Sequence, residues 1–171
     1  MPHLMPHTRS DRFRRLLLYE RESHMRILAA LEAVPEAGRE HPSFRKAITL
    51  MAHVCRARQL WISRMGGPIG APSEVFPEGL SLGELGAELH RAHEISWVHL
   101  SRLDDSVLDV PFTYRSLEGE GFRNTVDDVL TQLFGHSLYH RGQVALLLRG
   151  LGVAPPTTDF VLWAREPTAE S

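Results

Sequence analysis

Residues 126–151 read VDDVLTQLFGHSLYHRGQVALLLRGL, and this stretch decides the fold class. An α-helix turns by about 100° per residue, so residues that follow one another at steps of three and four lie on one side. The residues on one such side are Val126, Leu130, Leu133, Ser137, His140, Val144, Leu147 and Leu151. The pattern predicts a long helix with this side in a core, capped by Asn124 or Thr125 and ended by Gly150 and Gly152.

Three further segments show helical periodicity, at about 11–34, 43–65 and 82–103. Ser43 is the expected N-cap of the second helix, and Ser81 and Glu84 have capping-box spacing before the third. Four amphipathic helices predict an all-α fold, an antiparallel four-helix bundle. We expect one domain over residues 1–171, with its core at about 9–165 and mobile ends at 1–8 and 166–171.

The connections between the helices differ in length and composition. A long connection rich in Gly and Pro, GGPIGAPSEVFPEG at 66–79, follows the second helix. The stretch VLDVPFTYRSLEGEGFR at 107–123 predicts a short hairpin that turns around Glu118 to Gly121, before the fourth helix. We expect the last apolar segment, TTDFVLWAR at 157–165, to pack back onto the bundle.

Two histidines stand four residues apart on the fourth helix, His136 and His140. His136 lies about 40° around the helix from His140, so both rings can reach one point inside the bundle. Gln143 follows His136 by seven residues and is expected to lie above it, where it can hydrogen-bond a ligand ring or a bound water.

The second helix offers a third imidazole, His53, on the face that also carries Leu50, Val54, Ala57, Leu60 and Trp61. Three neutral imidazoles would suit zinc, nickel, iron or copper and leave a position open for water or substrate. Spacing alone leaves a second interpretation open, in which these are core histidines with ordinary hydrogen bonds. Cys55 lies on another face, and we interpret it as a small core residue rather than a ligand.

Composition excludes several classes of protein. The 171 residues carry a net charge of −2, which argues against a broad nucleic-acid surface. Interleaved acidic residues indicate that the basic cluster near the start, between Arg9 and Arg21, is a solvated helix face. No apolar run approaches the roughly 20 residues that span a bilayer, and the N-terminus lacks the apolar core of a signal peptide. We expect a cytoplasmic protein without a membrane partner, and the single cysteine agrees with a reducing compartment.

The end of the chain resembles a known family. HSLYHRGQV, followed by LRGLGVAPPTTDF at 148–160, is similar to the conserved end of the DinB family, and His53 with Trp61 fits the place of that family's third ligand. The resemblance covers about 9–165 and departs at Gln132, where many relatives carry another histidine. It implies a four-helix bundle, often a homodimer, with a divalent metal held by His53, His136 and His140, zinc or nickel before iron or copper.

The resemblance also implies a class of chemistry. The best-defined relatives are transferases and isomerases that use low-molecular-weight thiols. Our leading hypothesis is therefore a metal-dependent enzyme acting on a small molecule, a thiol-dependent S-transferase or a hydrolase. The alternatives are a non-catalytic metal-binding sensor or stress-response binding protein, and a purely structural bundle that binds no metal.

Other polar residues could line the cavity of such a site. Glu20 and His24 lie near the apolar face of the first helix, with packing the preferred role for His24. Arg141 is interpreted as a surface ion pair, with contact to a substrate anion as the alternative. His93 could approach the pocket, but a solvated position is preferred for it.

The remaining histidines have weaker claims. His90 and His99, with His93, are spread around the third helix rather than gathered on one face. His3 and His7 belong to the N-terminal segment and matter only as adventitious metal ligands.

Overall fold

The computed structural model describes residues 7–166. Within them the chain forms helices and one two-stranded sheet: α1 Arg9–Glu32, α2 Glu36–Arg39, α3 Pro42–Arg64, α4 Leu82–Ser101, α5 Asp105–Leu108, β1 Pro111–Arg115, β2 Gly121–Thr125, α6 Val126–Gly150 and α7 Phe160–Ala164. The predicted all-α class is confirmed in this broad sense. Most of the two ends expected to be mobile lies outside the described residues, but Thr8 caps α1.

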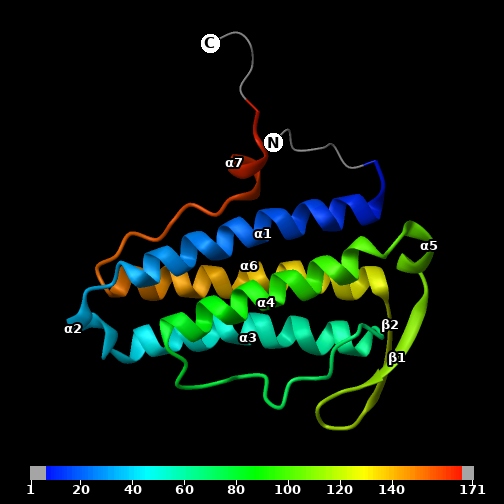
Figure 1. The fold of residues 1–171 in the computed structure, drawn as a ribbon, viewed down its shortest axis with the longest axis horizontal. Coiled ribbons are helices and arrows are strands. Elements are labelled where there is room, and N and C mark those ends of the chain that lie inside the picture. The colour runs from blue at the N-terminus through cyan, green and yellow to red at the C-terminus, as the bar shows by residue number, and fades with distance from the viewer. Residues whose placement is uncertain (1–6, 167–171) are drawn as a thin grey trace.

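The four long helices contact one another in a ring, α1 with α4 and α6, and α3 with α4 and α6. Figure 1 shows that α1 and α6 run in one direction and α3 and α4 in the other. Each long helix therefore has one parallel and one antiparallel neighbour. The parallel pair α3–α4 explains the long connection, because the chain must return along α3 before α4 can begin.

Two apolar clusters fill the two ends of the helical ring. One cluster is built around Ile27, Leu31, Met51, Leu89 and Leu148. The other consists of Phe13, Leu17, Leu100, Leu108, Val129, Leu130, Leu133 and Phe134. Many of the buried polar residues of the long helices lie between these clusters, as His24 on α1, His93 on α4 and Ser137 on α6 show. The middle of the molecule is thus a polar layer between two apolar ends.

Side-chain caps set the beginnings of the long helices. Ser81 forms the predicted capping box with Glu84, and Thr125, one of the two expected caps of the last long helix, forms a second box with Asp128. The prediction of Ser43 as the cap of α3 is wrong. The ring of the preceding His41 accepts the backbone N–H of Ser43 at 3.1 Å, because Pro42 at the first helical position starts the helix one residue earlier.

The predicted hairpin is present, and β1 pairs with β2 antiparallel, with Tyr114 opposite Phe122. Its turn lies slightly earlier than expected, since Gly121 already belongs to β2 and Gly119 takes the positive φ of 92°.

The C-terminal segment packs on α1, as expected. The hydroxyl of Tyr19 donates to the carbonyl of Thr158 at 2.5 Å, and the ring of Tyr19 meets Phe160 and Trp163 edge-on. In Figure 1 this segment runs along α1, with α7 above it.

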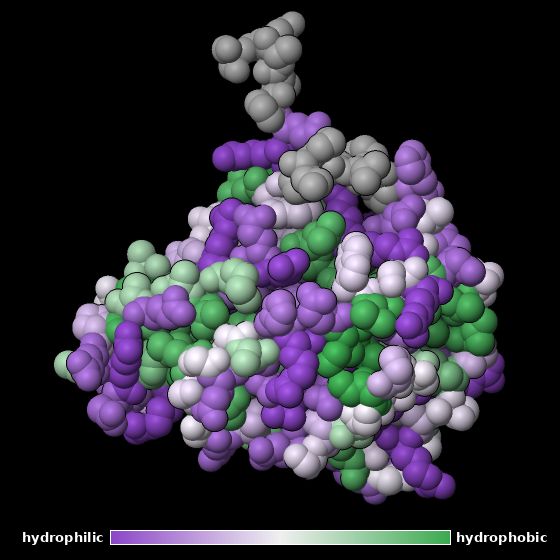
Figure 2. Space-filling view, viewed as in Figure 1, coloured by the Kyte–Doolittle hydropathy of each residue, from purple (hydrophilic) through white to green (hydrophobic). Residues whose placement is uncertain are grey.

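No helix among residues 7–166 is long and apolar enough to cross a membrane. Figure 2 shows hydrophobic residues in separate patches among hydrophilic ones on the face it presents.

We predict that Leu31→Ala lowers the free energy of unfolding by about 2–5 kcal/mol, because it leaves a cavity in a fully buried site. Urea unfolding measures the loss. Leu146→Ala is the matched control, since Leu146 is 68% exposed, and its cost should stay within about 0.5 kcal/mol. Equal losses for the two variants would contradict the assignment of Leu31 to the core.

Candidate metal centre

The three histidines singled out in the sequence come together. His53 extends from α3, and His136 and His140 extend from adjacent turns of α6. The Nε2 atom of His136 lies 3.1 Å from that of His53 and 3.0 Å from that of His140. His53 and His140 are buried and His136 is half-buried, so the cluster reaches solvent at His136.

Hydrogen bonds at the far side of two rings fix their tautomers. The Nδ1–H of His53 donates to the carbonyl of Val75 at 2.7 Å, and the Nδ1–H of His140 donates to Oε1 of Gln143 at 2.7 Å. Both rings therefore direct an Nε2 lone pair at His136. One N–H on His136 can satisfy only one of these lone pairs well, whereas a cation satisfies both.

The spacing of the three nitrogens fits a shared metal ion. Two nitrogens bound to one zinc ion at about 2.0–2.1 Å are about 2.9 Å apart at a right angle and about 3.3 Å apart at a tetrahedral angle. The separations of 3.1 and 3.0 Å at His136 fall in this range. The residues present therefore fit a divalent cation with three imidazole ligands.

Burial favours the neutral, metal-binding form of His53 and His136. Loss of solvent contact lowers the pKa of His53, and it lowers the pKa of His136 to about 4, with the neighbouring His140 and His53 adding to the effect on His136. Protons therefore compete weakly for His136 near neutral pH.

Gln143 holds a ligand ring, as the sequence suggests, but a different one. It contacts His140 rather than His136. Residues three apart are neighbours on a helix, whereas residues seven apart are separated by about 10 Å along the axis, beyond the reach of a glutamine side chain.

The connection after α3 covers His53, which the sequence reasoning missed. Phe76 stacks on the His53 ring with centroids 3.8 Å apart and planes 5° from parallel, and the neighbouring Pro77 is fully buried. A backbone carbonyl such as that of Val75 carries no sequence signal. The aromatic ring next to a proline in a loop rich in Gly and Pro was the available hint.

Glu20, a predicted cavity residue, does not join the cluster. It forms a buried ion pair with Arg58, whose guanidinium lies 5.2 Å from the centre of the Phe134 ring. Arg58 is close enough to contribute to the lowered pKa of His136, so this ion pair lies in the same polar layer.

His24 and His93 bond to each other across α1 and α4. Nδ1 of His24 lies 3.2 Å from Nε2 of His93, and Nε2 of His24 lies 2.9 Å from the hydroxyl of Ser137. The preferred solvated position for His93 is wrong, since the residue is 5% exposed, and His99 is buried as well. Periodicity on one helix does not reveal a polar partner on another. His90 of the same helix is exposed.

The interpretation of Arg141 as a surface residue is also wrong. It is 2% exposed, its guanidinium donates to the Tyr19 hydroxyl at 2.6 Å, and it lies 5.0 Å from the centre of that ring. The long side chain reaches across to α1, where the C-terminal segment covers Tyr19. Arg141 thus ties the ligand-bearing helix to α1.

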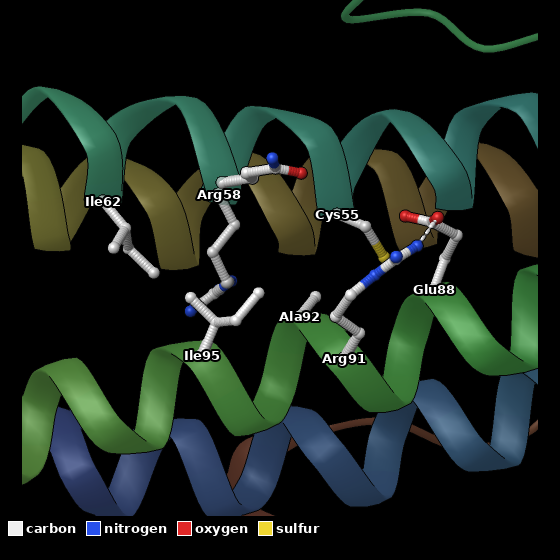
Figure 3. A pocket seen from close by; sticks show the side chains of 8 residues that line it. Cys55, Arg58, Ile62, Glu88, Arg91, Ala92 and Ile95 are labelled. Atoms are coloured by element: carbon white, nitrogen blue, oxygen red, sulfur yellow. Dashed lines mark hydrogen bonds and ion pairs between the residues drawn. The ribbon is translucent and has the colours of Figure 1, made fainter. Parts of the chain in front are cut away.

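Cys55 is a core residue, as interpreted from the sequence. Figure 3 shows it between α3 and α4 in a narrow pocket with Ile62, Ala92 and Ile95, beside the contact of Glu88 with Arg91. Burial raises the pKa of its thiol to about 12, so the thiol stays protonated near neutral pH.

A groove of about 850 Å³ lies beside the turns of α6 that precede His136. It is lined by Trp61 of α3, Tyr114 of the hairpin and α6 residues that include Asp127, Gln132 and Gly135. Gln132 therefore faces this groove, one turn before the first α6 ligand.

The family model of the DinB family matches residues 5–169. The chain belongs to the DinB family. The resemblance drawn from HSLYHRGQ is thereby confirmed, over nearly the whole chain. A search of curated proteins found no match.

The buried histidines His24 and His93 predict that the free energy of unfolding depends on pH. Burial lowers the pKa of His24 well below its usual value and that of His93 to about 3, so the unfolded chain binds more protons below about pH 6.5. The free energy of unfolding therefore falls as the pH falls, with His93 contributing about 2 kcal/mol of loss at about pH 5. Urea unfolding at about pH 7.5 and about pH 5, in chelator, measures this loss.

The matched variants are His93→Gln, which should lose about 2 kcal/mol less than the wild type on acidification, and the exposed His90→Gln, which should follow the wild type. An unchanged pH slope in His93→Gln would show that His93 does not contribute in this way.

Proposed function

We propose that the protein is a divalent-metal-dependent enzyme of the DinB type that acts on a small molecule. The observation that carries this proposal is the convergence of three Nε2 atoms, two of them fixed as lone pairs by Val75 and Gln143. Without a cation this arrangement places like groups against one another in a partly buried site, which is unfavourable. We also take the four long helices to be the four-helix bundle of the family.

His53, His136 and His140 would hold the metal through neutral nitrogens. A cation on three neutral ligands keeps most of its charge and lowers the pKa of a water or thiol bound beside it, which supplies a nucleophile near neutral pH. Val75 and Gln143 would keep the rings oriented, and half-buried His136 marks where solvent and substrate reach the site. Zinc or nickel is the proposed metal, with iron or copper as alternatives.

The reaction we propose is thiol-dependent S-transfer or hydrolysis. The groove beside the turns of α6 that precede His136 offers room for the body of a small substrate or of a low-molecular-weight thiol. Its aromatic residues Trp61 and Tyr114 and its polar α6 residues could contact both apolar and polar groups.

One observation favours a second candidate, a metal-binding sensor without turnover. Glu20 and His24 are the two residues of the first helix that the sequence offered as cavity residues. Glu20 is bound to Arg58, and His24 is bound to His93 and Ser137. Both side chains are thus engaged elsewhere in the layer rather than with the ligand histidines.

We also propose that the protein is a homodimer, and this proposal rests on the family resemblance.

We expect one tightly bound metal ion per chain. Elemental analysis measures it, after untagged protein is incubated with zinc or nickel and the excess metal is removed. His140→Ala should lose most of the bound metal, because two ligands remain, while the control His90→Ala should keep it. Metal content far below one per chain in the wild type would refute the site.

Gln143→Leu should weaken zinc binding about 10- to 100-fold, since it removes the hydrogen bond that orients His140. Calorimetric titration of the metal-free protein measures the affinity. Gln132→Leu is the matched control and should bind zinc like the wild type, because Gln132 faces the groove. If the two variants bind zinc equally well, Gln143 does not position the ligand.

Catalysis is tested with metal-loaded protein, a panel of thiols and an electrophile such as a chloroarene. We expect conjugation above the uncatalysed rate with at least one thiol, lost in His140→Ala. Absence of conjugation with every thiol, together with full metal content, would favour the sensor.

A further inference from the structure

Two exposed aromatic rings contact histidines of the cluster, one from the connection after α3 and the other from α6. Phe76 of the connection after α3 stacks on His53, and it is 52% exposed. Tyr139 of α6 meets His140 edge-on, with centroids 5.1 Å apart and an interplanar angle of 74°, and it is 65% exposed. Each ring thus has one side against the cluster and much of its surface in solvent.

The exposure of Phe76 does not come from a loosely attached loop. The residue before it, Val75, accepts the hydrogen bond of His53, and the residue after it, Pro77, is fully buried. Phe76 is therefore held between two anchors, and its ring is presented to solvent from a fixed position.

Tyr139 is placed beside the open edge of the cluster. It follows half-buried His136 by three residues on α6, so the two side chains are neighbours on the helix surface. The histidine cluster thus has an exposed aromatic ring against His53 and another against His140, and the second is also a helix neighbour of half-buried His136.

We propose that Phe76 and Tyr139 are the specificity-determining walls of the site and select a ligand with a planar aromatic group next to its metal-binding anion. The inference rests on the proposed metal-dependent function. Aromatic rings prefer offset-stacked and edge-to-face contacts with other rings, which each of these exposed rings can offer to a ligand bound at the cluster.

The test compares two hydroxamates that bind zinc through the same group, benzohydroxamic acid and acetohydroxamic acid. Calorimetric titration of zinc-loaded protein should show at least tenfold tighter binding of the aromatic compound. Phe76→Ala and Tyr139→Ala should each weaken binding of benzohydroxamic acid about three- to tenfold and leave acetohydroxamic acid unchanged. Phe122→Ala, a change at a 46% exposed phenylalanine of the hairpin, is the matched control and should bind both compounds like the wild type.

The outcomes separate this proposal from the proposed function. Zinc content is measured first, and protein that binds no zinc would refute the metal site itself. Full zinc content with equal affinity for the two hydroxamates would overturn the aromatic walls alone. Equal weakening of both compounds in Phe76→Ala, with Phe76→Leu restoring them equally, would show that Phe76 only positions His53 and would also overturn the proposal.

Discussion

The convergence of His53, His136 and His140 on one point is the constraint on which the rest of the structure depends. Three polar rings share a small, partly buried space, and two of them face it with lone pairs. Such an arrangement is stable only if the two rings that present lone pairs are held from behind and a group that accepts those lone pairs lies in front. The protein supplies the first through Val75 and Gln143, and the geometry leaves the second to a cation.

The requirement to hold these rings extends through the middle of the molecule. The segment of α6 that carries His136 and His140 also carries Ser137 and Arg141, which bond to His24 and Tyr19 of α1. These contacts satisfy groups that would otherwise be buried without partners, each at a cost of about 1–3 kcal/mol. Apolar clusters at both ends of the helices then provide the stability that a polar layer cannot. The layer thus fixes the position of α6 relative to α1 and α3.

Much of this arrangement follows from the sequence, because helical periodicity reports which side of each helix faces inward. The stripe on residues 126–151 and the inward face of His53 predicted that the three histidines lie close together, but spacing alone left open whether they hold a metal. Contacts between helices were not predictable in the same way. The burial of His93 depends on His24, and that of Arg141 on Tyr19, and neither pair has a sequence spacing that announces it. Val75 orients the His53 ring through its backbone carbonyl. Because every residue has a backbone carbonyl, the sequence does not show which one accepts this hydrogen bond.

X-ray absorption at the zinc edge of zinc-loaded protein tests the central claim most directly, because it reports the number and kind of ligand atoms around the metal. The account predicts three imidazole nitrogens at about 2.0–2.1 Å from zinc, with at least one further oxygen or nitrogen donor completing the coordination. His140→Ala should show one imidazole fewer. A wild-type spectrum with fewer than three imidazoles, or one that His140→Ala leaves unchanged, would contradict it.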